Sequence, residues 1–68
     1  MAINLHETAN ALRNYANNQI DRHGRDGQVA DVYAATVADI INGQFTLDDP
    51  IALEMIKWAT VRGLIKNI

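Results

Sequence analysis

Few side chains in this sequence of 68 residues are of the types that enzymes use for catalysis. It contains no Cys and no Ser, so its aliphatic hydroxyls are those of Thr8, Thr36, Thr46 and Thr60. A catalytic site needs a nucleophile or an acid–base group, together with a second side chain that orients it. None of the threonines stands in a nucleophile motif, so we expect that the protein is not an enzyme and has no catalytic residues.

The possible metal ligands are poorly placed for a shared site. His6 and His23 stand near opposite ends of one predicted helix, about 25 Å apart at ~1.5 Å per residue. Asp48 and Asp49 could begin a metal-binding loop, but no calcium-loop spacing of oxygen ligands follows them, and helix capping accounts for both. The chain also lacks thiolate ligands and a glycine-rich phosphate loop. We therefore expect neither a bound metal nor a cofactor.

The segment Gly24-Arg25-Asp26-Gly27 has the G-x-x-G spacing with which KH domains clamp a nucleic-acid backbone. A KH domain also needs a β-sheet, and the sequence predicts no strand. Asp26 would in addition place a negative charge against phosphate. We interpret this segment as a glycine-rich turn between two helices.

The balance of charge argues weakly against a nucleic-acid partner. Six Lys and Arg against eight Asp and Glu give a net charge of −2, whereas nucleic-acid binders usually carry a basic surplus. In a helix-turn-helix protein the third predicted helix would be the recognition helix. The N-terminal end of a recognition helix normally faces bases and phosphates, and here two acids precede it. A small DNA- or RNA-binding regulator remains the alternative hypothesis. It predicts a basic cluster made of Arg13, Arg22 and Arg25, with Lys57 or Arg62 nearby.

Glycine-containing stretches divide the chain into three segments with helical periodicity. We predict one domain over residues 1–68, with helices at about 5–23, 27–42 and 50–66. The fold class is all-α, a small three-helix bundle or a helical hairpin-type domain.

The boundaries of these helices follow from local signals. Asn4 is the expected N-cap of the first helix, with Glu7 placed as in a capping box, and Gly24 is its expected C-cap. The third helix has the clearest start, because Asp49 precedes Pro50 at the first helical position. Gly63 would lie inside that third helix, where glycine costs roughly 1 kcal/mol relative to Ala.

The third predicted helix is apolar around more than one side. A surface helix in a small bundle needs an apolar stripe of only about 100°. The stripe here is much wider, because it contains Ile51, Leu53, Met55, Ile56, Trp58, Leu64 and Ile65. A chain of this size offers little protein to cover both sides, so we expect a second chain to do so and predict a homodimer or larger homo-oligomer.

Five residues are the best candidates for contact with a partner protein. Trp, Tyr and Arg are the usual anchors of protein interfaces, which favours Tyr15, Arg22, Arg25, Trp58 and Arg62. Tyr15 is loosely tied to the stripe of its helix and is expected to be exposed. Packing in the core is the competing interpretation for Trp58.

These features favour a small, non-enzymatic protein–protein interaction module, an adaptor or inhibitor of a larger protein. By analogy alone, a phage or mobile-element accessory protein is one specific version. The N-terminus lacks the basic and apolar regions of a signal peptide, and no apolar run approaches the roughly 20 residues that span a membrane. The expected location is therefore the cytoplasm.

Overall fold

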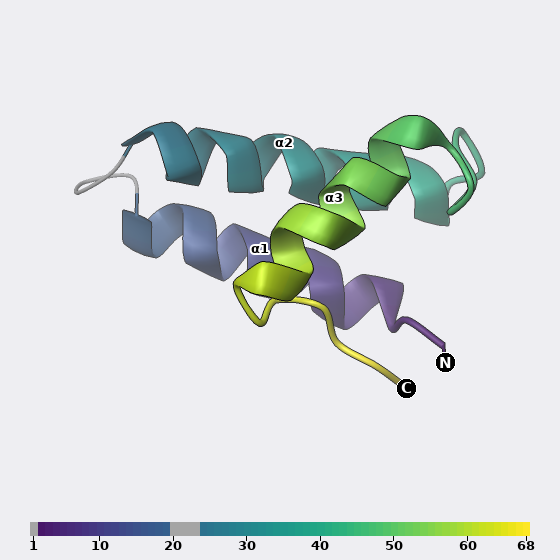
Figure 1. The fold of residues 1–68 in the computed structure, drawn as a ribbon, viewed down its shortest axis with the longest axis horizontal. Helices are drawn as coiled ribbons and strands as arrows, with labels where there is room; N and C mark the ends of the chain where they lie inside the picture. The colour runs from purple at the N-terminus through teal and green to yellow at the C-terminus, as the bar shows by residue number, and fades with distance from the viewer. Residues whose placement is uncertain (1, 20–23) are drawn as a thin grey trace.

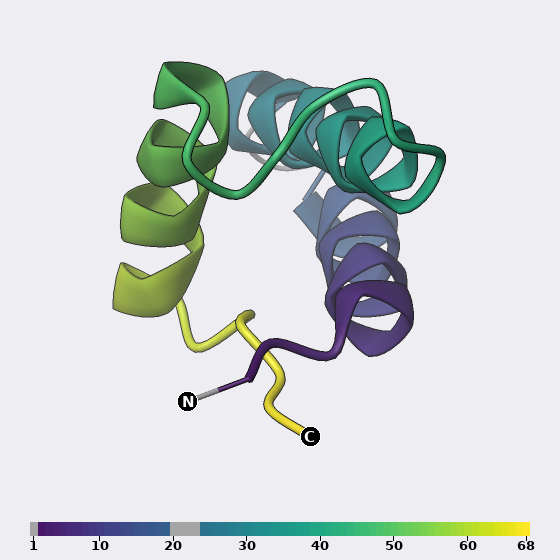
Figure 2. The ribbon, with the colours of Figure 1, turned by 90° about the vertical axis from the view of Figure 1, so that its right-hand side faces the viewer.

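The computed structural model describes residues 2–19 and 24–68. These residues form three helices, α1 (Leu5–Gln19), α2 (Gly24–Ile41) and α3 (Pro50–Val61). Figure 1 shows α1 and α2 lying side by side, with α3 crossing them obliquely. Figure 2 looks along the α1–α2 pair and shows α3 on one side of it. The predicted all-α class is confirmed.

The start of α2 differs from the prediction. Gly24, Arg25, Asp26 and Gly27 are the first residues of α2 rather than a turn between helices. The interpretation of Gly24 as the C-cap of the first helix is therefore wrong. The predicted end of that helix, residues 20–23, lies outside the described residues, as does the candidate site residue Arg22.

Small residues bring α1 and α2 close together. Ala9 and Ala16 of α1 and Ala30 and Ala34 of α2 are all buried in one core cluster. The spacing of two packed helices depends on the side chains between them, and alanine lets two backbones approach closely. As a result, the backbone of α2 lies near that of α1 along much more of its length than near that of α3.

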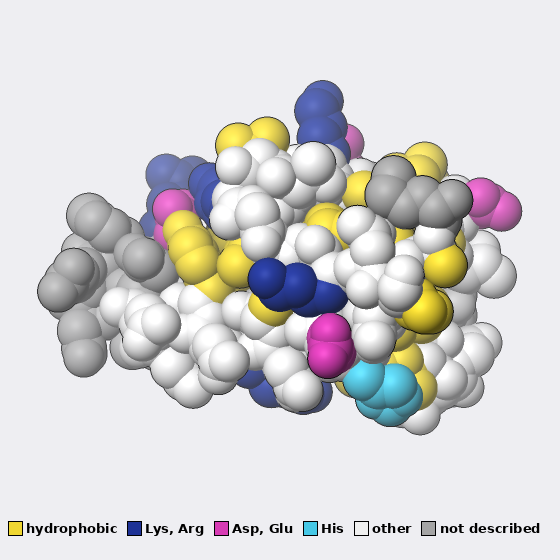
Figure 3. Space-filling model, turned by 90° about the horizontal axis from the view of Figure 1, so that it is seen from below, with side chains coloured by type: hydrophobic (Ala, Val, Ile, Leu, Met, Phe, Trp, Pro, Cys, Tyr) yellow, Lys and Arg dark blue, Asp and Glu magenta, His cyan; other side chains and the backbone are white. Residues whose placement is uncertain are grey.

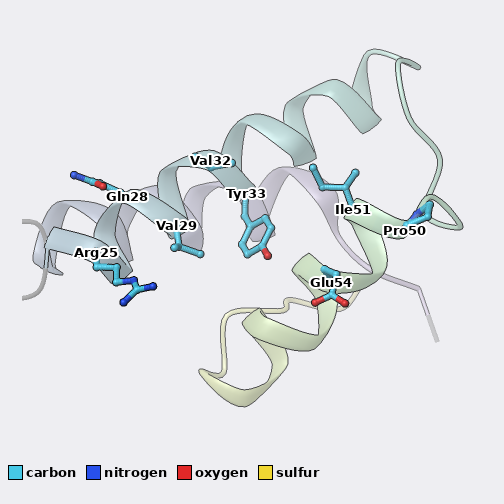
Figure 4. A pocket seen from close by; sticks show the side chains of 8 residues that line it. All are labelled: Arg25, Gln28, Val29, Val32, Tyr33, Pro50, Ile51 and Glu54. Atoms are coloured by element: carbon cyan, nitrogen blue, oxygen red, sulfur yellow. The ribbon is translucent and has the colours of Figure 1, made fainter.

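The apolar surface of α2 has two faces. The face towards α1 is built from alanine and Val37, which is fully buried. Val29 and Tyr33, which the periodicity places in the same stripe as Val37, are only half-buried, and Val32 is exposed. These three residues lie on the side of α2 that faces α3 (Figure 4).

The start of α3 agrees with the sequence, and its end does not. Asp49 caps the helix by accepting a hydrogen bond from the Ile51 amide at 3.2 Å, and Pro50 follows it. The helix ends at Val61, five residues before the predicted 66, because Gly63 adopts a φ of 71°. The amide of Gly63 donates to the Thr60 carbonyl and that of Leu64 to the Ala59 carbonyl, which is a Schellman motif.

The segment after α3 returns to the beginning of the chain. Ile3 and Asn67 form an isolated antiparallel bridge, and the Asn4 amide donates to the Lys66 carbonyl at 2.8 Å. The Asn4 side chain accepts from the Glu7 amide at 3.1 Å, which confirms Asn4 as the N-cap of α1. The buried Thr8 hydroxyl accepts from the Lys66 amide at 3.1 Å and donates to its carbonyl. The segment that follows α3 is thus fixed to the start of the chain and to α1.

Candidate functional site

A hollow of about 710 Å³ lies between α2 and α3. We call it the α2–α3 groove, and its lining residues are Arg25, Gln28, Val29, Val32, Tyr33, Pro50, Ile51 and Glu54 (Figure 4). Two of its apolar side chains face solvent, since Val32 is 58% and Ile51 39% exposed. The groove is therefore open to the outside along both helices.

The groove is apolar in its middle, with a basic residue at one end and an acidic residue towards the other. In Figure 4 Arg25 and Gln28 lie at one end, on the first turns of α2, and Pro50 and Ile51 lie at the other. Val29, Val32 and Tyr33 lie between them, and Glu54 projects from α3 on the Pro50 side. From Arg25 to Tyr33 the α2 wall is about 12 Å long at ~1.5 Å per residue.

One aromatic residue from each helix meets beside this groove, and we call the three the aromatic cluster. The ring of Trp58 lies edge-on to Tyr15, with centroids 5.8 Å apart at 89°. The Trp58 ring also lies beside that of Tyr33, with centroids 5.5 Å apart and an interplanar angle of 58°. Such pairs contribute about 0.5–1.5 kcal/mol each beyond the area they bury. Tyr33 belongs to both the cluster and the groove, so the cluster supports the groove wall.

Arg62 binds the aromatic cluster to the first turn of α2. Its guanidinium carbon lies 4.0 Å from the centroid of the Trp58 ring, and its Nη1 donates to the Trp58 carbonyl at 3.2 Å. Its Nη2 is 3.7 Å from Asp26 Oδ2, where the Asp26 side chain is 40% exposed. Exposed ion pairs contribute about 0–1 kcal/mol, so the stacking on Trp58 is the more important contact.

The structure brings four of the five predicted partner-binding residues to one region. Tyr15, Trp58 and Arg62 form or bind the aromatic cluster, and Arg25 lines the adjoining groove. Tyr15 is half-buried against Trp58, so the expectation that it is exposed is wrong. Trp58 is itself half-buried and supports the groove wall through Tyr33.

Sequence analysis did not single out most of the groove. The missed lining residues are Gln28, Val29, Val32, Pro50, Ile51 and Glu54. A usable signal was the width of the apolar stripe on residues 29–41, which exceeds what one neighbouring helix can cover.

Two of the basic residues that the alternative hypothesis groups together, Arg13 and Arg25, line different hollows of the described surface. Arg13 lines a separate hollow beside α1 and the end of α2, with His6 and Asn42, whereas Arg25 lines the α2–α3 groove. On the face seen in Figure 3 the Lys and Arg side chains are distributed over several places, and some of them lie beside an acidic one.

Comparisons with known proteins add no function. The chain matches no protein-family model, no curated protein and no solved structure. Across residues 2–19 and 24–68, no helix is long and apolar enough to cross a membrane. Within the same ranges, no three His, Asp or Glu side chains are grouped as a metal site requires. A function must therefore be inferred from the groove and the residues that support it.

Proposed function

We propose that this chain is a non-enzymatic protein–protein interaction module, an adaptor or inhibitor whose contact surface is the α2–α3 groove. The observation that carries the proposal is the exposure of Val32 and Ile51 on two different helices that face one hollow. Contiguous apolar surface open to water commonly marks an interaction site. Covering the exposed part of each side chain would contribute about 1 kcal/mol.

The contacts that hold α2 and α3 in place favour a preformed binding surface. Trp58 and Tyr33 separate α3 from α2, and Arg62 binds the end of α3 to Asp26. The bonds between Thr8 and Lys66 fix the segment that follows α3. A surface that is already ordered loses little conformational entropy on binding, which leaves more of the contact energy for affinity.

A single pair of variants tests the contact surface. Val32→Asp places a charge in the groove, whereas Ile68→Asp places one at a position that is 89% exposed and outside the groove. We expect affinity capture from a nuclease-treated lysate to retain the same protein with the wild type and Ile68→Asp, and to lose it with Val32→Asp. Circular dichroism melts check that both variants fold.

Two other outcomes would change the proposal. Retention of the protein by Val32→Asp would remove the groove as the contact surface. Captured material that disappears with nuclease would favour the DNA- or RNA-binding regulator instead.

Self-association is part of the proposal and has its own test. Leu53 is 54% and Val61 80% exposed on α3, so the apolar stripe of this helix is not fully covered by its own chain. We expect light scattering at micromolar concentration to give the mass of a dimer or larger. A monomer mass with a stable fold would contradict the homo-oligomer.

A further inference from the structure

We infer that the α2–α3 groove binds an amphipathic helix of another protein, with an acidic residue at one end of its apolar ridge and a basic residue at the other. This inference rests on the proposed function and adds the chemistry of the partner. It follows from the shape of the groove, from its charged ends and from the exposed faces of the chain itself.

The dimensions of the groove fit two to three turns of helix. Its α2 wall extends about 12 Å from Arg25 to Tyr33. An apolar ridge of three residues, spaced four and then three apart, covers about 10 Å of a helix. Helices that dock in apolar grooves use this spacing for their anchors. Such a ridge would place its anchors against Val29, Val32 and Ile51, which line the groove.

The charged ends of the groove specify the charges of the partner. At one end lies Arg25, on the first turn of α2, where the helix dipole adds partial positive charge. Asp26 lies next to it in sequence, but its carboxylate is 3.7 Å from Arg62. Towards the other end Glu54 projects from α3, and Asp48 and Asp49 directly precede Pro50. An acid therefore fits the Arg25 end of the groove, and a base fits the Glu54 end.

The described helices of this chain do not supply such a ridge from a second copy. The exposed residues of α1 within the described range are all polar, namely His6, Glu7, Asn10, Arg13, Asn14, Asn17 and Asn18. On the outer side of α3, Leu53 and Val61 stand two turns apart, with Lys57 between them. Two grooves placed face to face would leave the hollows of both unfilled. A helix of a different protein is the better match.

Labelled peptides test the inference directly. We would use three helical peptides of about 14 residues with the same leucine ridge. The first has Glu at one end and Lys at the other, the second Glu at both ends, and the third Lys at both ends. Fluorescence anisotropy with the full chain should give the tightest binding for the mixed peptide, by about fivefold over the other two.

A charge reversal in the protein should change this order. We expect Arg25→Glu to weaken the mixed peptide about fivefold and to make the peptide with Lys at both ends the tightest binder. Arg13→Glu carries the same change of charge outside the groove and serves as the control, with the order of the wild type.

The outcomes separate this inference from the proposed function. If all peptides bind equally and Val32→Asp abolishes that binding, the groove is the binding site, but the charges inferred for the two ends of the partner helix are wrong. If no peptide binds but the Val32→Asp variant no longer captures a protein that the wild type retains, the proposed function is supported and the inference of a helical partner is wrong. If Val32→Asp dissociates a dimer of the chain, the occupant is a second copy, which also overturns the inference.

Discussion

The two faces of α2 are packed in different ways. Towards α1 the contact consists of alanine from both helices, together with the fully buried Leu12 and Val37. Towards α3 it includes the rings of Tyr33 and Trp58, whose centroids are 5.5 Å apart, and a groove of about 710 Å³ lies alongside. The first interface is filled by the chain itself, and the second is only partly filled.

This difference has a simple physical origin. Alanine side chains let two helices pack closely, so little space remains between them. Large rings hold α2 and α3 further apart where they meet, and the short stretch from Pro50 to Glu54 has no ring to fill the same gap. The close interface is filled by the chain itself, and the spaced interface leaves the apolar side chains of Val32 and Ile51 exposed.

Removing the ring that separates α3 from its neighbours should have the largest effect. We expect Trp58→Ala to lower the free energy of unfolding by about 3 kcal/mol, because Trp58 contacts Tyr15, Tyr33 and Arg62. A domain of this size has roughly 3–5 kcal/mol in all, so much of the variant should be unfolded at 25 °C. Circular dichroism measures this, with Trp58→Phe as the ring-preserving control. Equal melting of the two variants would show that the aromatic cluster does not hold α3.

Enlarging a side chain should have different consequences on the two faces of α2. Ala34→Leu enlarges a side chain that is 1% exposed in the alanine interface, and overpacking there should cost about 2 kcal/mol. Val32→Leu adds a methylene group that faces the open groove, and its effect should stay within about 0.5 kcal/mol. Urea unfolding of the pair measures the contrast. Similar losses in both variants would mean that the two interfaces are equally filled.

Local signals in the sequence predicted the starts of two helices correctly. Asn4, Asp49 and Pro50 act through hydrogen bonds and backbone angles within a few residues, so their roles do not depend on the rest of the fold. Gly63 was misassigned because a glycine in an apolar segment is compatible with either a helix interior or a helix end. The choice depends on Leu64, which packs against the core.

The groove was harder to predict, because it depends on the distance between two helices. The valines of α2 gave a strong apolar pattern, and Ala30 and Ala34 gave a weak one, since alanine is common on both buried and exposed faces. The apolar periodicity of α2 therefore includes the fully buried Val37 as well as Val29 and Val32, which line the groove, and it does not separate the two faces. Tyr15, Arg25, Trp58 and Arg62 were chosen by residue type alone, and they reach one region because α3 crosses the other two helices.

A smaller effect is expected where α3 ends. Gly63 has a φ of 71°, and an added Cβ would meet nothing within 4 Å. Gly63→Ala should therefore cost only the backbone strain of the left-handed conformation, about 1 kcal/mol. Thermal melts measure this loss, with Thr60→Ala as a control within the exposed last turn. An unchanged melting temperature would show that the Schellman motif does not fix the end of the helix.

The smallest effect should come from Arg62, and it separates the stack on Trp58 from the ion pair. Arg62→Lys keeps the charge near Asp26 but loses the planar group that lies 4.0 Å from the Trp58 centroid. We expect it to cost about 0.5–1 kcal/mol. Asp26→Asn removes only the ion pair, whose carboxylate is 40% exposed, and should cost less than about 0.5 kcal/mol. Denaturant unfolding at low and high salt compares the two variants. If Asp26→Asn costs more, and only at low salt, then charge rather than stacking holds α3 beside the first turn of α2.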